Sequence, residues 1–255
     1  MTVSLAQLRQ QMQRIECPQL GQRSCLPFGV EALDAHLPGG GLALGALHEV
    51  AGGGDLGTAH GAAATLFTAG ILARMDGPVL WCVSAPDLFA PGLAQAGLTP
   101  DRLLYAEAGD DKTTLILAEE GLRHSGLAAV VAELERLPMV ASRRLQVAAR
   151  KSGVTAIALR RWRTPQAAAT EFGQPTSSTT RWQVTALPST PAPFLALLST
   201  IGRARWRVEL VRCRGADSNS WEVEACDAQG RLGELADMAD GQAAAGLGSR
   251  RATTG

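Results

Sequence analysis

A glycine-rich loop between a short strand and a helix constrains the fold of this chain most. Residues 52–59 keep the G-x-x-x-x-G frame of a phosphate-binding loop, from Gly52 to Gly57. The stretch 46–50 predicts a strand before the loop, and the alanine-rich stretch 62–72 predicts a helix after it. Strand, glycine turn and helix is the context that such a loop requires, so we expect an α/β domain.

The same loop lacks the side chains that act on a phosphate. A working loop carries a lysine after its second glycine and then a Ser or Thr that binds magnesium. Thr58 and Ala59 occupy these positions here. The chain has two lysines, Lys112 and Lys151, and neither follows a glycine frame of this kind. We therefore expect an NTPase fold that does not hydrolyse NTP, with no catalytic residue and no cofactor.

The rest of the chain alternates between predicted strands and predicted helices. The continuous apolar run over residues 78–83 is typical of a buried parallel strand, and further strands are expected over residues 103–106, 127–133 and 155–159. Helices are expected over residues 86–97, 112–123 and 143–151, with Asp110 or Asp111 as the N-cap of the second. This alternation predicts a mostly parallel sheet covered by helices on both faces.

The C-terminal part of the domain has a different pattern. Apolar and polar residues alternate over 205–211 and again over 221–225, with a Gly-Ala-Asp-Ser-Asn-Ser segment between them. This pattern predicts an antiparallel hairpin added to the parallel sheet.

Domain boundaries follow from composition. Residues 1–17 carry apolar side chains at helical spacing and predict an amphipathic helix, which could dock on its own domain or on a second copy. Residues 18–27 are expected to be a linker, and residues 26–235 to form the core domain. The Gly/Ala-rich residues 236–255 predict a disordered tail.

Cysteine usage and hydropathy exclude several classes of protein. The five cysteines are scattered without a C-x-x-C pair, and the four histidines lack metal-ligand spacing, so neither a zinc site nor a disulfide framework is expected. No apolar run reaches 18 residues, and the N-terminus does not resemble a signal peptide. A cytoplasmic location is expected.

Charge is distributed unevenly along this neutral chain. Residues 136–214 contain 13 arginines and one lysine against two acidic residues, a net charge of +12. Three tryptophans lie beside these arginines, a mixture that suits single-stranded DNA or an acidic protein partner. A solvated arginine face with core tryptophans is the alternative. The candidate DNA- or partner-binding residues are Arg160, Arg161, Trp162, Arg163, Arg181, Arg203, Arg205 and Arg207.

Several motifs carry a family resemblance. Residues 28–45, with Phe28-Gly29, Leu33-Asp34 and Leu37-Pro38-Gly39-Gly40-Gly41, resemble the entry to the RecA-like ATPase core. The broken loop, followed by Arg-Trp-Arg-Val-Glu-Leu at 205–210 and Trp-Glu-Val-Glu at 221–224, is more specifically similar to ImuA. ImuA proteins are RecA-like members of bacterial damage-inducible mutagenesis cassettes, and the resemblance covers about residues 5–235.

The resemblance also locates the positions at which RecA-like proteins act. The loop lysine falls on Thr58, the magnesium hydroxyl on Ala59, and the catalytic glutamate near Ala85. The Walker B acid falls on Glu133, which could hold a metal, although Glu133 and Glu49 are better explained as structural or surface-facing residues. The DNA-binding loops correspond to residues 134–142 and 160–180.

The function implied is a non-catalytic adaptor in SOS-induced, error-prone translesion DNA synthesis. The expected partner is an ImuB-like inactive Y-family polymerase homologue, and through it an error-prone DnaE-type polymerase. Single-stranded DNA and a second copy of the chain are further candidate ligands. Two alternatives remain at this stage: a SulA-like cell-division inhibitor and a DNA-stimulated RecA-like ATPase.

Overall fold

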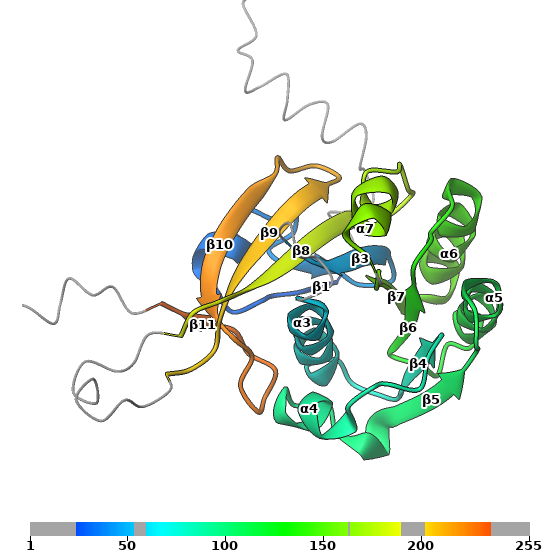
Figure 1. The fold of residues 1–255 in the computed structure, drawn as a ribbon, viewed down its shortest axis with the longest axis horizontal. Coiled ribbons are helices and arrows are strands. Elements are labelled where there is room, and N and C mark those ends of the chain that lie inside the picture. Colours follow the sequence, from blue (N-terminus) through cyan, green and yellow to red (C-terminus); the bar gives the residue numbers. More distant parts are fainter. Residues whose placement is uncertain (1–23, 54–59, 163, 190–201, 236–255) are drawn as a thin grey trace, which may run out of the picture.

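The computed structural model describes residues 24–53, 60–162, 164–189 and 202–235. In this part of the chain one sheet of nine strands runs in the order β11-β10-β9-β8-β3-β7-β6-β4-β5 (Figure 1). The predicted N-terminal helix and C-terminal tail lie outside the described residues, as do positions 54–59 of the glycine loop.

Six neighbouring strands of the sheet are parallel. They are β3 (Leu47–Gly52), β4 (Val79–Val83), β5 (Leu103–Glu107), β6 (Ala129–Leu134), β7 (Thr155–Arg160) and β8 (Thr180–Leu187). The parallel sheet predicted from the apolar runs is therefore confirmed. The sequence did not predict β8, whose first half is buried although it contains Arg181.

Helices cover both faces of this sheet. α3 (Gly61–Ala73) and α4 (Ala90–Gln95) pack on one face, whereas α5 (Asp111–Gly121) and α6 (Met139–Ser152) pack on the other (Figure 1). The short α7 (Pro165–Phe172) connects β7 to β8. α2 (Glu31–Asp34) and a turn of 3₁₀ helix, η2 (Pro100–Arg102), complete the described helices.

Local chemistry explains where the helices begin and end. Asp110 caps α5, because its carboxylate accepts the backbone N–H of Thr113 at 2.8 Å, as the sequence predicted. α6 ends at Gly153, whose φ of 81° is left-handed. α4 is shorter than the predicted helix over 86–97. A helix beginning at 86 would place Pro91 in its interior, where proline breaks the hydrogen-bond ladder, so the helix begins at Ala90 instead.

The antiparallel extension has the predicted alternation. In β9 (Arg205–Cys213) the side chains of Trp206, Val208 and Leu210 are buried and those between them face outward. β10 (Asn219–Glu224) pairs antiparallel with β9, and β11 (Gly233–Glu234) pairs antiparallel with β10. The hairpin therefore extends the sheet beyond β8.

The predicted linker over residues 18–27 is wrong at its C-terminal end. Cys25–Leu26 forms β1, which pairs antiparallel with β2 (Leu42–Ala43). Gly41 permits this pairing, because a side chain there would collide with the backbone carbonyl of Leu26. In the chain as described, no helix has the length and apolar character needed to cross a membrane.

Candidate functional site at the carboxyl edge of the sheet

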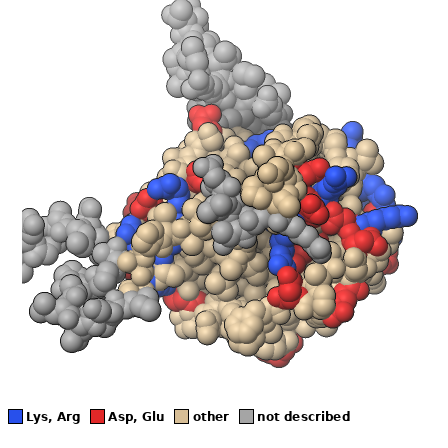
Figure 2. Space-filling model, in the orientation of Figure 1, with Lys and Arg blue, Asp and Glu red and all other residues tan. Residues whose placement is uncertain are grey.

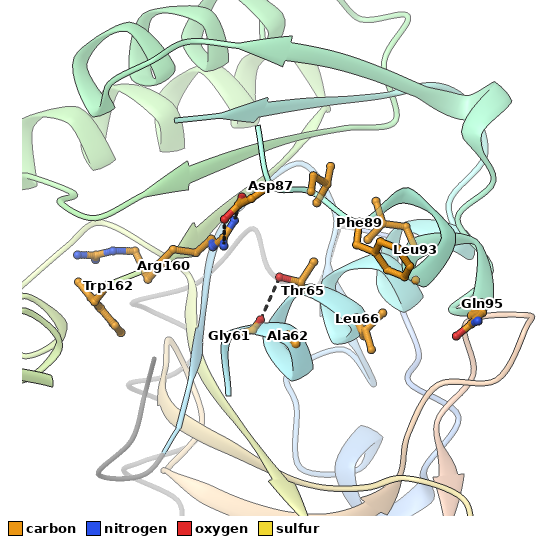
Figure 3. A pocket seen from close by; sticks show the side chains of 13 residues that line it. Gly61, Ala62, Thr65, Leu66, Asp87, Phe89, Leu93, Gln95, Arg160 and Trp162 are labelled. Atoms are coloured by element: carbon orange, nitrogen blue, oxygen red, sulfur yellow. Dashed lines mark hydrogen bonds and ion pairs between the residues drawn. The ribbon is translucent and has the colours of Figure 1, made fainter. Parts of the chain in front are cut away.

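The carboxyl ends of the parallel strands border a cleft. Ligands of open α/β sheets bind at this edge, so its side chains are the first candidates for function. The cleft has a volume of about 410 Å³ and lies between the first turn of α3, the segment after β4 and the segment after β7 (Figure 3). Gly52 is the last residue of β3, whereas Gly57, Thr58 and Ala59 lie outside the described residues.

One polar cluster lies on the α3 face of the sheet, around Glu133. Its buried carboxylate accepts Trp81 Nε1–H at 2.8 Å and Arg161 Nη1–H at 2.7 Å. Arg161 also makes a bidentate pair with Asp87, with both N···O distances 2.7 Å. The bonds to Asp87 raise the pKa of Arg161 against the opposing effect of burial, and Glu133 adds to the rise. Glu133 is therefore held by the fold.

A second polar cluster lies around Glu49, whose side chain is fully buried. Arg160 donates to it at 2.9 Å, Arg181 at 3.1 Å and the Ser178 hydroxyl at 2.7 Å, and the Thr176 hydroxyl donates as well. Burial by itself raises the pKa of Glu49, but Arg181, the two hydroxyls and Arg160 outweigh it. Its pKa is therefore below the ordinary value.

The second cluster fastens the segment around α7 to the sheet. Arg160 Nη2 and Trp162 Nε1 both donate to the carbonyl of Glu135, each at 2.9 Å. The Trp162 ring packs edge-on against Phe172 of α7, with the ring centroids 5.6 Å apart, and Arg181 donates to the Phe172 carbonyl at 2.7 Å. These bonds hold the connection between β7 and β8 in one arrangement.

The structure separates the predicted binding residues into three groups. Arg160, Trp162 and Arg181 lie in the interior, and Arg161 is half-buried between Asp87 and Glu133. Arg163 lies outside the described residues. The hairpin group forms ion pairs with glutamates of β10. Arg203 pairs with Glu224, and both Arg205 and Arg207 pair with Glu222.

The tryptophans of the basic stretch are core residues. Trp162, Trp182 and Trp206 are all buried, so their flat faces are covered by the fold. For the tryptophans, the alternative given by the sequence is therefore correct: they are core residues and not a surface that stacks on bases. Whether the exposed arginines bind DNA or a partner stays a prediction.

The acidic residue at the position expected for a magnesium-binding carboxylate is engaged by the fold. Glu133 stands at the expected position, but Arg161 and Trp81 already occupy its two oxygens. Within the described ranges, no group of three His, Cys, Asp or Glu side chains could hold a metal ion. In this arrangement the carboxylate of Glu133 on β6 joins β4 and the segment after β7.

Sequence reasoning missed part of this site and one other surface. Asp87 and Trp81 carried no signal, because the contacts that define their role come from distant strands. Three exposed cations of α6 that line this other surface were counted in the basic stretch but not singled out: Arg143, Arg144 and Lys151.

Comparison with known proteins fits this architecture. Protein ImuA of Caulobacter vibrioides, found in two strains, is 40% identical over 211 residues, which are 80% of this chain and 84% of the relative. The chain belongs to the ImuA family. No protein-family model matches the sequence. As a member of this family, the chain is a RecA-like protein of the mutagenesis-cassette type, as its sequence motifs predicted.

One solved structure confirms the fold of this ImuA-family protein. The crystal structure of the RadB recombinase aligns with a TM-score of 0.53 at 18% identity, over 83% of this chain and 100% of that chain. SulA from Pseudomonas aeruginosa aligns at a TM-score of 0.38 and 24% identity, over 46% of this chain and 98% of that chain. The likeness to RadB shows a RecA-like fold and nothing further.

Proposed function

We propose that this ImuA-family protein is a non-catalytic adaptor in damage-induced, error-prone translesion synthesis. It binds an ImuB-like inactive Y-family polymerase homologue and, through it, an error-prone DnaE-type polymerase. Family membership supports the pathway, and the chemistry of the carboxyl edge supports the non-catalytic role.

The observation that carries the non-catalytic role is the engagement of Glu133. A RecA-like ATPase needs a carboxylate free to act on magnesium at the end of this strand. Here Arg161 and Trp81 hold that carboxylate in the interior. The loop residues Thr58 and Ala59 supply neither the lysine nor the magnesium-binding hydroxyl, so the loop and the strand each lack a group that hydrolysis needs.

Restoring the loop tests whether the losses are independent. The double variant Thr58→Lys, Ala59→Thr is expected to remain inactive in a phosphate-release assay with magnesium ATP and single-stranded DNA, because Glu133 is still held. ATP turnover by the wild type would contradict the proposal outright. Turnover by the double variant would show that the loop alone had been disabled.

The cellular role is tested by deletion. Loss of the gene is expected to abolish damage-induced mutagenesis while cell division stays normal. Filamentation on overexpression, with mutagenesis unaffected by deletion, would instead favour a division inhibitor.

Direct contact with single-stranded DNA is the finer part of the proposal. The exposed candidates are Arg203, which precedes β9, and Arg207, which lies within β9, and both are paired with glutamates. Anisotropy of a labelled oligonucleotide, titrated at low and moderate salt with and without ATP, measures this contact. Phosphate contacts predict binding that weakens steeply with salt and ignores ATP.

A further inference from the structure

Two adjoining hollows lie along α5 and α6 on the face of the sheet opposite the cleft, and together they are called the α5–α6 groove. Its larger part has a volume of about 890 Å³ and its smaller part about 430 Å³. Glu119 and Arg144 line both parts, and their ion pair crosses the groove where the two parts meet. α5 has 11 residues and α6 has 14, so each of the two helices makes three to four turns.

The α6 side of this groove exposes apolar side chains. Val140 is 72% exposed and Val147 is 58% exposed, and Met139 lies beside them. Val140 and Val147 are seven residues apart, which places them on one stripe of the helix. Ile116 of α5 adds a further exposed apolar side chain in the smaller part. Single exposed apolar residues are ordinary, but a row of them along a groove marks an interaction site.

The rim of the groove is positively charged. Arg123, Arg143, Arg144 and Lys151 line its larger part against one carboxylate, Glu119. Glu119 is itself neutralised, since it pairs with Arg144 and with Arg123 at 3.1 Å. In the described part of the chain no ion pair engages Arg143 or Lys151. Figure 2 shows Lys and Arg side chains interspersed with Asp and Glu side chains on the right of the molecule, where α5 and α6 lie.

We propose that the α5–α6 groove binds an amphipathic helix with an apolar stripe and acidic flanks, carried by the polymerase-like partner. The inference rests on the proposed function and names the surface that performs it. A helix in a groove buries its apolar face against the floor and sets its charged flanks against the rim. Acidic flanks complement the charges of Arg143 and Lys151. This complementarity would speed the association of the two proteins and fix the position of the bound helix along the groove.

The charges of the groove disfavour the other occupants. The predicted amphipathic segment of this chain, residues 4–16, carries Arg9 and Arg14 and one acidic residue, Glu16. Its arginines would be repelled by the cations of the rim. A nucleic acid would neutralise the rim but would leave Val140 and Val147 without an apolar partner. An acidic amphipathic helix satisfies both the floor and the rim.

Calorimetric titration of the full-length chain with the purified ImuB-like partner tests the proposal. Val147→Asp places a charge on the exposed floor and is expected to weaken binding at least about tenfold. Val211→Asp is the matched control, because Val211 is an exposed valine of β9 at the other end of the sheet. It is expected to bind the partner like the wild type.

The rim is tested separately by charge reversal. The double variant Arg143→Glu, Lys151→Glu is expected to weaken binding about tenfold at low salt and to flatten its dependence on salt. Both side chains are exposed, and neither is needed for the fold. Unchanged affinity and an unchanged salt slope would contradict the acidic flanks.

A photo-crosslink identifies the occupant. With p-benzoylphenylalanine at position 140, the crosslinked peptide is expected to come from an acidic amphipathic segment of the partner. A crosslink to a second copy of this chain, to DNA or to a basic segment would overturn the proposal.

Failure of this inference is distinguishable from failure of the proposed function. If the wild type does not bind the partner, the adaptor role fails, and the groove proposal fails with it. If the wild type binds and Val147→Asp binds equally well, the adaptor role stands and the groove proposal is wrong. Loss of binding in Val211→Asp alone would place the partner on the hairpin.

Discussion

Two sets of cations within one basic stretch of sequence serve opposite purposes. Arg160 and Arg181 lie in the interior and share the carboxylate of Glu49, so their charge is used to build the fold. Arg143 and Lys151 lie on the exposed face of α6 and rim an apolar groove. Both sets contribute to the same net charge of +12. A buried charged side chain whose counter-ion is supplied by the fold is not available to a partner, whereas an exposed one is.

The difference also concerns energetics. A buried ion pair gains little net stability over an apolar pair, but removal of one member leaves an uncompensated charge in the interior. An exposed pair contributes at most about 1 kcal/mol. Substitutions should therefore act on stability in the interior set and on affinity in the groove set.

The largest effect on stability is expected for Glu49→Ala. It leaves Arg160 and Arg181 buried without their carboxylate, and should lower the free energy of unfolding by about 3–5 kcal/mol. Urea denaturation measures the loss. Glu222→Ala on the hairpin, which leaves exposed arginines behind, is the matched control and should cost less than about 1 kcal/mol. Equal losses of unfolding free energy in the two variants would contradict the claim that interior arginines depend on their carboxylate more than surface arginines do.

A smaller effect is expected for Arg161→Ala. The variant removes the cation from Glu133 and leaves that buried carboxylate with Trp81 alone. Because Arg161 is half-buried and water can approach, the free energy of unfolding should fall by about 2 kcal/mol. Thermal unfolding followed by circular dichroism measures this loss. A gain in stability would show that the Glu133 cluster is not structural.

The pH dependence of stability sharpens the account of Glu49. Its pKa lies below the ordinary value of 4.5, so its stabilising effect is fully present above that pH. The effect is lost as the pH falls through the lower pKa of the folded state, because the unfolded chain binds the proton first. The difference in unfolding free energy between the wild type and Glu49→Gln should therefore shrink from pH 6 toward pH 3. A constant difference over this range would contradict the assignment.

The smallest effect on stability is expected on the hairpin. Arg203→Ala and Arg207→Ala each remove an exposed ion pair, so each should change the unfolding free energy by less than about 1 kcal/mol. Their effect on oligonucleotide anisotropy is the informative measurement. If both variants bind single-stranded DNA as the wild type does, the hairpin is not the DNA contact.

Short-range patterns made most of the fold predictable. Strands buried on both faces are continuous apolar runs, and the alternation in β9 marks its buried face, so both were visible in the sequence. β8 was not, because Arg181 lies in its buried half. The charge is tolerated there only because Glu49, 132 positions away, is its partner.

The candidate site was less predictable for the same reason. Glu49 and Arg160 are 111 positions apart, and Glu133 and Trp81 are 52 apart, so no local pattern joins them. The degenerate loop could be found because its positions are contiguous. The groove has a local signature, exposed valines at 140 and 147 with cations between them, but burial had to be known before it could be interpreted.

The central claim is that this protein joins partners without nucleotide chemistry. Calorimetric titration with the purified ImuB-like partner, run with and without magnesium ATP, tests it most directly. The account predicts the same stoichiometry and affinity in both titrations, with no phosphate released. Absence of binding, or binding that requires ATP and is lost on its hydrolysis, would contradict it.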